Sequence, residues 1–310
     1  MKTARRVAFE NLVSGFPANS YIYQEQPYEE QVQRAAQLLL EADAYVIGMG
    51  AGLSTAAGHT YGGERFTSNF GEFIERYGSQ YMRDMYTAGF YPFPGEQAKW
   101  AFWARNVSVN RIDTPAMPLY KELFDMFQGK QIHILSTNVD HQPQLAGFRE
   151  EQIFATQGDY GEIQCKRGCH PKVYNAVDRF KQMNQAMKNC KIPEYMVPKC
   201  PVCGGPMEMH LRMDQHFVED DAWHGAAGRY VDFLREHKND KVVLLELGVG
   251  FNTPTIIRFP FESMVGERKN WSLIRLNLNE AVVPDTADER VIGINEDIAK
   301  SLLDIKKKLK

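Results

Sequence analysis

An apolar run that ends in closely spaced glycines is the feature that most constrains the fold of this chain. The run 45–49 (YVIGM) leads into a turn of small residues that comprises Gly50, Ala51, Gly52, Ser54, Ala56 and Gly58. This order predicts a buried strand, a tight turn and the start of a helix, because glycine permits positive φ and a close approach of the backbone. Backbone N–H groups in such turns, together with the helix dipole, bind phosphate groups. We therefore expect a nucleotide to bind here.

The composition is that of a globular protein without an electrostatic signature for nucleic acid. The chain has 310 residues, of which 44% are hydrophobic and 24% charged, and its net charge is −3. Basic and acidic residues are spread along the chain, so we expect neither nucleic acid nor an anionic membrane as a partner. No window approaches the ~20 apolar residues of a membrane-spanning helix, and Glu10 and Asn11 break the apolar stretch that a signal peptide requires. We expect a cytoplasmic protein.

The order of helical and strand patterns predicts an α/β protein. Apolar runs with strand character occupy 45–49, 131–136, 152–156, 242–247, 271–277 and 290–294. Helical periodicity is found at 24–43, 115–127, 222–237 and from residue 296 onward. Strands that alternate with helices build a Rossmann-like, doubly wound parallel sheet. We assign this sheet to a nucleotide-binding domain made of residues 24–157 and 222–310.

Two inserted segments interrupt this pattern. Residues 66–111 are rich in Phe, Tyr, Trp and Met and lack strand alternation, which predicts a helical insertion. Residues 158–221 contain all five cysteines together with lysines and prolines, and a helical pattern covers 172–188. We expect this second segment to form a smaller zinc-binding domain.

Four of the cysteines are spaced as two metal-chelating turns. They are Cys165, Cys169, Cys200 and Cys203. Four thiolates suit tetrahedral zinc with no open coordination position, so we expect a structural site. Cys190 or His170 is an alternative ligand, because the first pair is separated by three residues instead of two. Free thiols or disulfides are the other interpretation of these cysteines.

Small and polar residues follow two of the predicted strands. They are Thr137, Asn138, Val139 and Asp140 after strand 131–136, and Gly248, Val249 and Gly250 after strand 242–247. Open parallel sheets bind ligands at the carboxyl ends of their strands, so we expect both groups to lie beside the glycine turn. The alternative is that the glycines only turn the chain and that Asn138 and Asp140 only cap a helix.

Taken together, these motifs resemble those of the sirtuins over residues 24–310. The turn 50–58 is similar to the G-A-G-x-S cofactor loop, 137–140 to the Q-N-(I/V)-D motif, and 248–250 to the loop that contacts ribose and phosphate. The resemblance implies NAD as co-substrate and a structural zinc ion. It also implies cofactor contacts by Arg65, Phe66, Gln157, Asn277 and Ile294.

Three departures point to one branch of that family. Gln157-Gly158 replaces the His-Gly of deacylating sirtuins, residues 59–66 replace I-P-D-F-R, and residues 215–220 replace V-V-x-F-G-E. This pattern is similar to the class M sirtuins, which are encoded beside a macrodomain hydrolase. The resemblance implies a protein ADP-ribosyltransferase. It also implies that the target is a lipoylated, glycine-cleavage H-like carrier protein and that the macrodomain hydrolase is a functional partner.

The chemistry of NAD indicates how such a replacement redirects the reaction. Nicotinamide leaves NAD as a neutral molecule, so the step needs correct orientation and no proton donor. We expect Asp140 to hold the carboxamide, and Asn138 and Gln157 to orient the ribose or the acceptor by neutral hydrogen bonds. These three are the predicted catalytic residues. Deacylation needs a base in addition, which a glutamine cannot supply.

Three alternatives stay open from the sequence. In the first, His59 or His216 takes the place of the missing base and residual deacylation survives. In the second, the protein hydrolyses NAD without an acceptor. In the third, it is a sensor that binds NAD or ADP-ribose without turnover.

Overall fold

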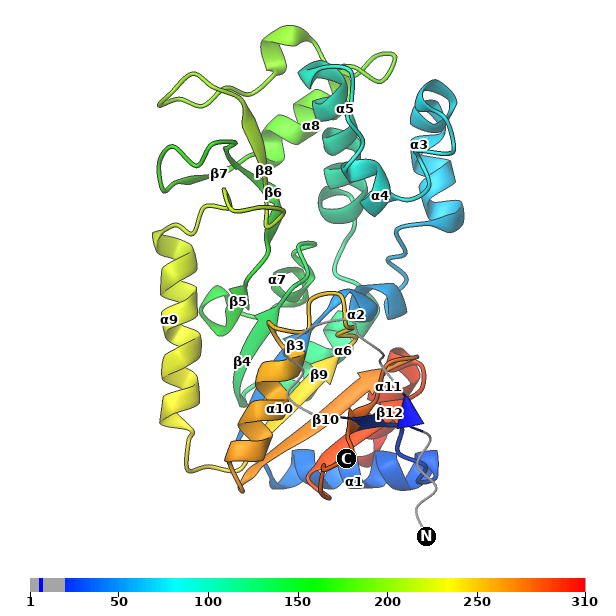
Figure 1. Ribbon diagram of the computed structural model, residues 1–310, viewed down its shortest axis with the longest axis vertical. Coiled ribbons are helices and arrows are strands. Elements are labelled where there is room, and N and C mark those ends of the chain that lie inside the picture. Colours follow the sequence, from blue (N-terminus) through cyan, green and yellow to red (C-terminus); the bar gives the residue numbers. More distant parts are fainter. Residues whose placement is uncertain (1–5, 8–19, 310) are drawn as a thin grey trace.

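The protein has a large sheet domain and a smaller domain above it (Figure 1). The structure, a computed structural model, describes residues 6–7 and 20–309. The segment 1–13, on which the signal-peptide expectation rests, lies mostly outside the described residues. Within the described part of the chain, every helix is too short or too polar to cross a bilayer.

The large domain is built on six parallel strands in the order β12-β10-β9-β3-β4-β5. Their bounds are β3 (Ala44–Met49), β4 (Gln131–Ser136), β5 (Ile153–Ala155), β9 (Val242–Leu247), β10 (Trp271–Asn277) and β12 (Val291–Asn295). Numbered from β3 along the chain, this is the order 3-2-1-4-5-6 of a doubly wound Rossmann sheet, which confirms the predicted fold class. The order reverses between β3 and β9, so a ligand is expected at the carboxyl ends of these two strands.

Helices cover both faces of this sheet. One face carries α1 (Tyr28–Glu41), α6 (Pro118–Phe127) and α11 (Ile298–Lys308), and the other carries α9 (Asp221–Glu236) and α10 (Arg258–Glu267). Side chains alternate along each strand: Tyr45 and Ile47 of β3 belong to the first core, and Ala44 and Val46 belong to the second. Both faces are buried, which explains the almost continuous apolar runs in the sequence.

The two inserted segments share a single hydrophobic core. The first contains α3 (Gly63–Tyr77), α4 (Met85–Gly89), α5 (Glu96–Val107) and the π-helical turn η1 (Ser108–Ile112). The second contains β6 (Gly158–Cys165), β7 (Val173–Asn175), α8 (Val177–Ala186), η3 (Glu194–Met196) and β8 (Met207–Leu211). The strands form an antiparallel sheet in the order β7-β6-β8. The helical insertion therefore packs on the cysteine-containing segment as one small domain.

One predicted element of the small domain is wrong at its start. The helix expected over 172–188 begins only at Val177, because Val173–Asn175 pairs with β6 as strand β7. Val173 and Tyr174 are of the types that favour strands, and the partner strand lies outside the window that helical periodicity samples.

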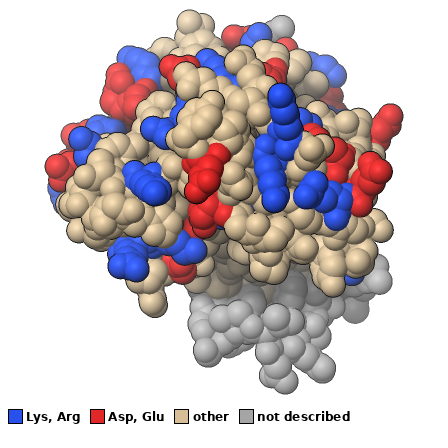
Figure 2. All heavy atoms as spheres, turned by 90° about the horizontal axis from the view of Figure 1, so that it is seen from above, with Lys and Arg blue, Asp and Glu red and all other residues tan. Residues whose placement is uncertain are grey.

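Short elements complete the fold. They are β1 (Arg6–Val7), β2 (Tyr21–Ile22) and β11 (Val283–Pro284), which form a third sheet, with α2 (Ala51–Ala56), α7 (Gln142–Ala146) and η2 (Glu150–Gln152). Seen from above, the small-domain end of the molecule carries basic and acidic side chains side by side (Figure 2).

Candidate active site

Two glycine loops meet at the switch point of the sheet. The Gly50 N–H donates to the Leu247 carbonyl, and the Gly52 N–H donates to the Gly248 carbonyl, each at 3.0 Å. A Cβ atom on Gly52 would lie 2.8 Å from the Gly248 Cα, and Gly248 itself has φ +63°. Only glycines permit this approach. Helix α2, which follows the first loop, has only six residues, so the expected phosphate contacts of these loops stay a prediction that rests on their backbone and not on a helix dipole.

Asn138 contacts the first glycine loop, at Gly50. Its Nδ2 donates to the Gly50 carbonyl (3.0 Å), and Ser54 Oγ (3.2 Å) and Tyr120 Oη (3.1 Å) are within reach. Within the described residues, Asn138 Oδ1 has no protein partner, so it is available to a ligand hydroxyl. The sequence did not predict Tyr120 as a site residue, because in the sequence it is one of the regularly spaced apolar residues of α6.

Asp140 is a buried carboxylate in the same network. Its side chain accepts the Ser54 hydroxyl at 2.5 Å and the Gln142 N–H at 3.2 Å, and the residue is only 2% exposed. Burial raises the pKa of Asp140, and the hydrogen bonds from Ser54 and Gln142 partly oppose this shift. No described cation lies within ion-pair distance of it. A buried carboxylate without a counter-cation is costly, so its oxygens depend on hydrogen-bond donors.

Gln157 lies between β5 and β6, where the chain passes from the large to the small domain. Its carbonyl accepts the Arg212 N–H at 3.1 Å, and its half-buried side chain makes no hydrogen bond to another described residue. Gly158 has φ +91°, and a Cβ atom there would lie 1.8 Å from the His210 carbonyl oxygen. The backbone at this junction is thus held rigidly while the glutamine side chain stays available.

A histidine that the sequence did not single out lies beside the predicted catalytic group. His141 has φ +65°, and its Nδ1 lies 2.6 Å from Asp159 Oδ2. Asp159 Oδ1 also accepts the Arg111 Nε–H at 2.7 Å. Burial alone would raise the pKa of Asp159, but the hydrogen bond from His141 and the charge of Arg111 lower it. No spacing pattern links these three residues, since they come from three separate elements.

Residues 59–66 lead into α3 and contact the small domain. Arg65 Nη1 donates to the Thr60 carbonyl and to Asn110 Oδ1, both at 2.9 Å. Phe66 is 1% exposed and its ring stacks on that of Phe70 at 5.0 Å. Phe66 is therefore a core residue here, and the expected contacts of Arg65 and Phe66 with a cofactor stay predictions.

The remaining predicted contacts lie along the carboxyl edge of the sheet. Asn277 Nδ2 donates to the Val249 carbonyl at 3.1 Å, so it supports the second glycine loop. Thr137 donates its N–H to the Met49 carbonyl at 3.0 Å, and the Val139 carbonyl accepts the Tyr160 N–H at 2.9 Å. Ile294 is fully buried in β12, two strands away from β9. Ile294 pairs with Leu276, next to Asn277, so it also lies near this edge, and its expected contact with the cofactor stays a prediction.

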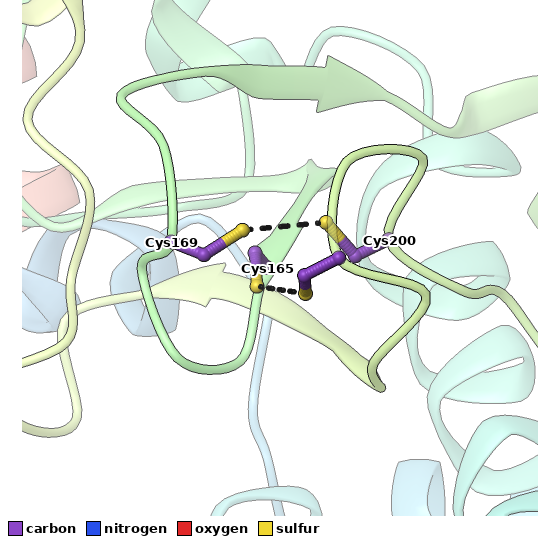
Figure 3. A group of neighbouring side chains, drawn as sticks. Cys165, Cys169 and Cys200 are labelled. Atoms are coloured by element: carbon purple, nitrogen blue, oxygen red, sulfur yellow. Dashed lines mark hydrogen bonds between the residues drawn. The ribbon is translucent and has the colours of Figure 1, made fainter.

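The four predicted cysteine ligands lie together in the small domain (Figure 3). All four sulfurs are within 4.8 Å of one another, with Cys165 and Cys203 at 3.7 Å and Cys169 and Cys200 at 3.6 Å. A tetrahedral zinc ion about 2.3 Å from each sulfur places the sulfurs about 3.8 Å apart, which matches these distances. The cluster is therefore suited to a structural zinc ion.

The two alternative ligands have other surroundings. Cys190 is 2% exposed and belongs to the hydrophobic core of the small domain. His170 Nδ1 lies 3.1 Å from Cys169 Sγ, while its Nε2 lies 2.7 Å from Tyr174 Oη. His170 thus borders the four-cysteine cluster and also contacts Tyr174.

A hollow of about 780 Å³ lies at the opposite edge of the sheet, between α6 and α9. It is lined by Lys130, His133 and Arg229 among others. None of the glycine loops or predicted catalytic residues reaches it. We therefore locate the active site from the strand ends and the hydrogen-bond network, and not from the size of this hollow.

Known proteins share this architecture. Sir2Tm bound to a propionylated peptide has a TM-score of 0.54 at 17% identity, over 90% of this chain and 99% of the other. A mutant Sir2 homologue in complex with ADP-ribose has a TM-score of 0.54 at 16% identity, over 89% and 97% of the two chains. At these identities the likeness establishes the fold alone. No protein-family model matches the chain.

A curated relative decides the family. "Protein ADP-ribosyltransferase" from Staphylococcus aureus is 38% identical over 287 residues, which cover 92% of this chain and 90% of that protein. The chain belongs to the class M sirtuins, a family of NAD-dependent protein ADP-ribosyltransferases. A second relative comes from Fusarium oxysporum and is named "Probable bifunctional ADP-ribose hydrolase/ADP-ribosyltransferase". It is 30% identical over 86% of this chain. That match covers only 46% of the longer fungal protein.

Proposed function

We propose that this class M sirtuin transfers ADP-ribose from NAD to a side chain of a carrier protein, releases nicotinamide and has little or no deacylase activity. The observation that carries the proposal is Gln157. It stands where deacylating members of the resembled family have histidine, in a chain that keeps the two glycine loops, Asn138 and Asp140.

Each of the three predicted catalytic residues has its own role in this proposal. When NAD is bound, its pyridinium ring is a leaving group that departs neutral and without a proton. The buried Asp140 carboxylate accepts hydrogen bonds from an amide and so holds a carboxamide in one orientation. Asn138, anchored through its Nδ2 to Gly50, presents Oδ1 to a ribose hydroxyl. Gln157 orients the incoming acceptor by a neutral hydrogen bond, so none of the three needs to change its protonation state.

Deacylation asks for a proton acceptor that this site lacks at residue 157. Burial and the charge of Arg65 lower the pKa of His59 to about 4, and its Nε2 is bound to Thr114 at 3.2 Å, so it is a weak base. The His216 carbonyl is held by the Gln164 side chain at 2.7 Å. Since a strand rises about 3.3 Å per residue, that point of β6 lies roughly 20 Å from Gly158. Neither histidine is a substitute for a base at residue 157 in our proposal.

The target and the partner belong to the same proposal. We take the acceptor to be a lipoylated, glycine-cleavage H-like carrier protein, and we take a macrodomain hydrolase to reverse the modification. The fungal relative, whose name joins a hydrolase and a transferase, supports the second assignment. A reducing compartment such as the cytoplasm suits the four free thiols of the zinc site.

The experiment combines purified protein, NAD labelled in its adenylate part, and the carrier protein with or without lipoate. We expect label on the lipoylated carrier together with stoichiometric release of nicotinamide. Asn138→Ala is expected to abolish both while the melting temperature stays within a few degrees of the parent. Full transfer by Asn138→Ala would remove this residue from the mechanism.

Two other outcomes would redirect the assignment. Nicotinamide release that does not depend on any carrier would identify a glycohydrolase. Tight binding of NAD without nicotinamide release, in the presence of carrier, would identify a receptor for the dinucleotide.

A further inference from the structure

A fully buried arginine supports the second glycine loop. Arg258, the first residue of α10, is 0% exposed. Its Nη1 donates to the Val249 carbonyl at 3.0 Å, and its Nη2 donates to the carbonyls of Glu280 (2.7 Å) and Val282 (3.0 Å). Its guanidinium carbon lies 3.9 Å from the centroid of the Phe251 ring. The cation is thus clamped between the loop 248–251 and the segment 280–282.

The buried carboxylates near Arg258 balance its charge but do not take its short hydrogen bonds. Two carboxylates are buried nearby, and both bind Arg275 closely: Glu246 at 2.7 Å and Glu262 at 2.8 Å. Arg258 lies 4.0 Å from Glu246 and 3.9 Å from Glu262, so its short hydrogen bonds all go to backbone carbonyls. A buried cation is costly unless its hydrogen bonds are well placed. The loop is therefore the part of the structure that Arg258 organises.

Because the peptide unit is planar, the hydrogen bonds to the Val249 carbonyl also fix the direction of the Gly250 N–H. The Val249 carbonyl accepts from Arg258 and from Asn277 Nδ2 (3.1 Å), so it points into the protein. In a trans peptide the N–H of the next residue points the opposite way. The Gly250 N–H therefore faces away from the interior, at the carboxyl end of β9 where the sheet order reverses. Within residues 20–309, no hydrogen bond from this N–H to a protein acceptor is found, whereas the next N–H, that of Phe251, donates to Glu280 Oε2 at 3.2 Å.

We propose that Arg258 is a positioning residue for the co-substrate: by holding the Val249 carbonyl, it aims the Gly250 N–H at a phosphate of the dinucleotide. The inference rests on the proposed function, because it assigns the phosphate-binding side of that same site. Arg258 itself touches no part of the ligand. Its effect belongs to binding and not to the bond-breaking step.

The test compares Arg258→Lys with Arg275→Lys. Lysine keeps the positive charge but cannot span several carbonyls as the guanidinium fork does. Arg275 lies in the same buried ion network and makes no contact with Val249, so its variant controls for general damage to the core. ADP-ribose affinity is measured by calorimetry, and kcat and KM for NAD are measured from nicotinamide release.

For Arg258→Lys we expect the Kd for ADP-ribose and the KM for NAD to rise by about tenfold to a hundredfold, as for loss of a hydrogen bond from a charged group. We expect kcat to stay within about threefold of the parent. For Arg275→Lys we expect a lower melting temperature with an unchanged Kd. If Arg258→Lys does not fold, Arg258→Gln replaces it in both measurements, since its side chain keeps N–H donors but loses the fork, and the same rise in Kd is expected.

The outcomes separate this inference from the proposed function. An unchanged Kd in Arg258→Lys, or an equal rise in Arg275→Lys, would overturn the role of Arg258. A fall in kcat at constant KM would overturn it as well. Absence of nicotinamide release by the parent protein would overturn the proposed function, while the ADP-ribose titration would still test Arg258.

Discussion

Replacement of Gly52 by alanine tests the contact between the two glycine loops most directly, and we predict that it weakens nucleotide binding in a protein that stays folded. The new Cβ would lie 2.8 Å from the Gly248 Cα and 2.9 Å from the Gly248 oxygen. Non-bonded carbon atoms prefer about 3.5–4.0 Å, so the two loops must separate by about 0.7–1.2 Å. This movement also breaks the 3.0 Å hydrogen bond from the Gly52 N–H to the Gly248 carbonyl.

The expected loss of stability is moderate. Overpacking of this kind costs about 1–3 kcal/mol, and the broken hydrogen bond costs about 1 kcal/mol more. A typical domain is stable by about 5–15 kcal/mol, so most molecules remain folded. We expect the Kd for ADP-ribose to rise by about tenfold to a hundredfold, as for loss of a hydrogen bond to a charged phosphate.

The assay pairs calorimetric titration of ADP-ribose with thermal unfolding. Gly71→Ala is the matched control: Gly71 is exposed in α3, and a Cβ atom there meets nothing within 4 Å. We expect this control to keep its affinity and to gain up to about 1 kcal/mol of stability, since alanine favours helix over glycine.

Two results would refute the reasoning. If Gly52→Ala bound ADP-ribose within about threefold of the parent, the close approach of the loops would not matter for the phosphate site. If Gly71→Ala lost affinity to the same degree, the titration would report general stability and not the contact between the two glycine loops.

Three further predictions concern the base, the pH dependence and the metal. Gln157→His alone should not restore robust deacylation of an acylated peptide, because residues 215–220 also depart from the deacylase pattern; robust deacylation would show that residue 157 alone decides the reaction. Burial lowers the pKa of His133 to about 4, so the unfolded chain binds the proton more tightly and stability falls as pH drops from 6.5 toward 4, by about 2 kcal/mol at pH 5. In His133→Phe the difference between urea midpoints at pH 7 and pH 5 should shrink, and an equal difference in both proteins would contradict this. Cys203→Ser should lose stoichiometric zinc and unfold the small domain, as followed by the fluorescence of Trp100 and Trp103 in its core, whereas a metal-free protein with unchanged fluorescence would contradict a structural site.

The sequence by itself determined the features that are written locally. Almost continuous apolar runs predicted the parallel sheet. A strand that is buried on both faces needs an apolar side chain at almost every position. Glycine at positions 50 and 52 predicted the close backbone approach, and two short cysteine pairs predicted the metal cluster. Each of these signals lies within a few residues, at the spacing that strand, turn or chelate geometry imposes.

Only the tertiary structure decided which distant residues complete the site. Tyr120 reaches Asn138 from a helix 18 positions earlier, Asp159 of β6 binds His141 at the start of α7, and Arg258 of α10 donates to the Val249 carbonyl. Strand β7 likewise exists because β6 lies beside it and offers backbone partners. Such contacts depend on how the elements pack, and no periodicity or short spacing in the chain encodes a hydrogen bond between separate elements.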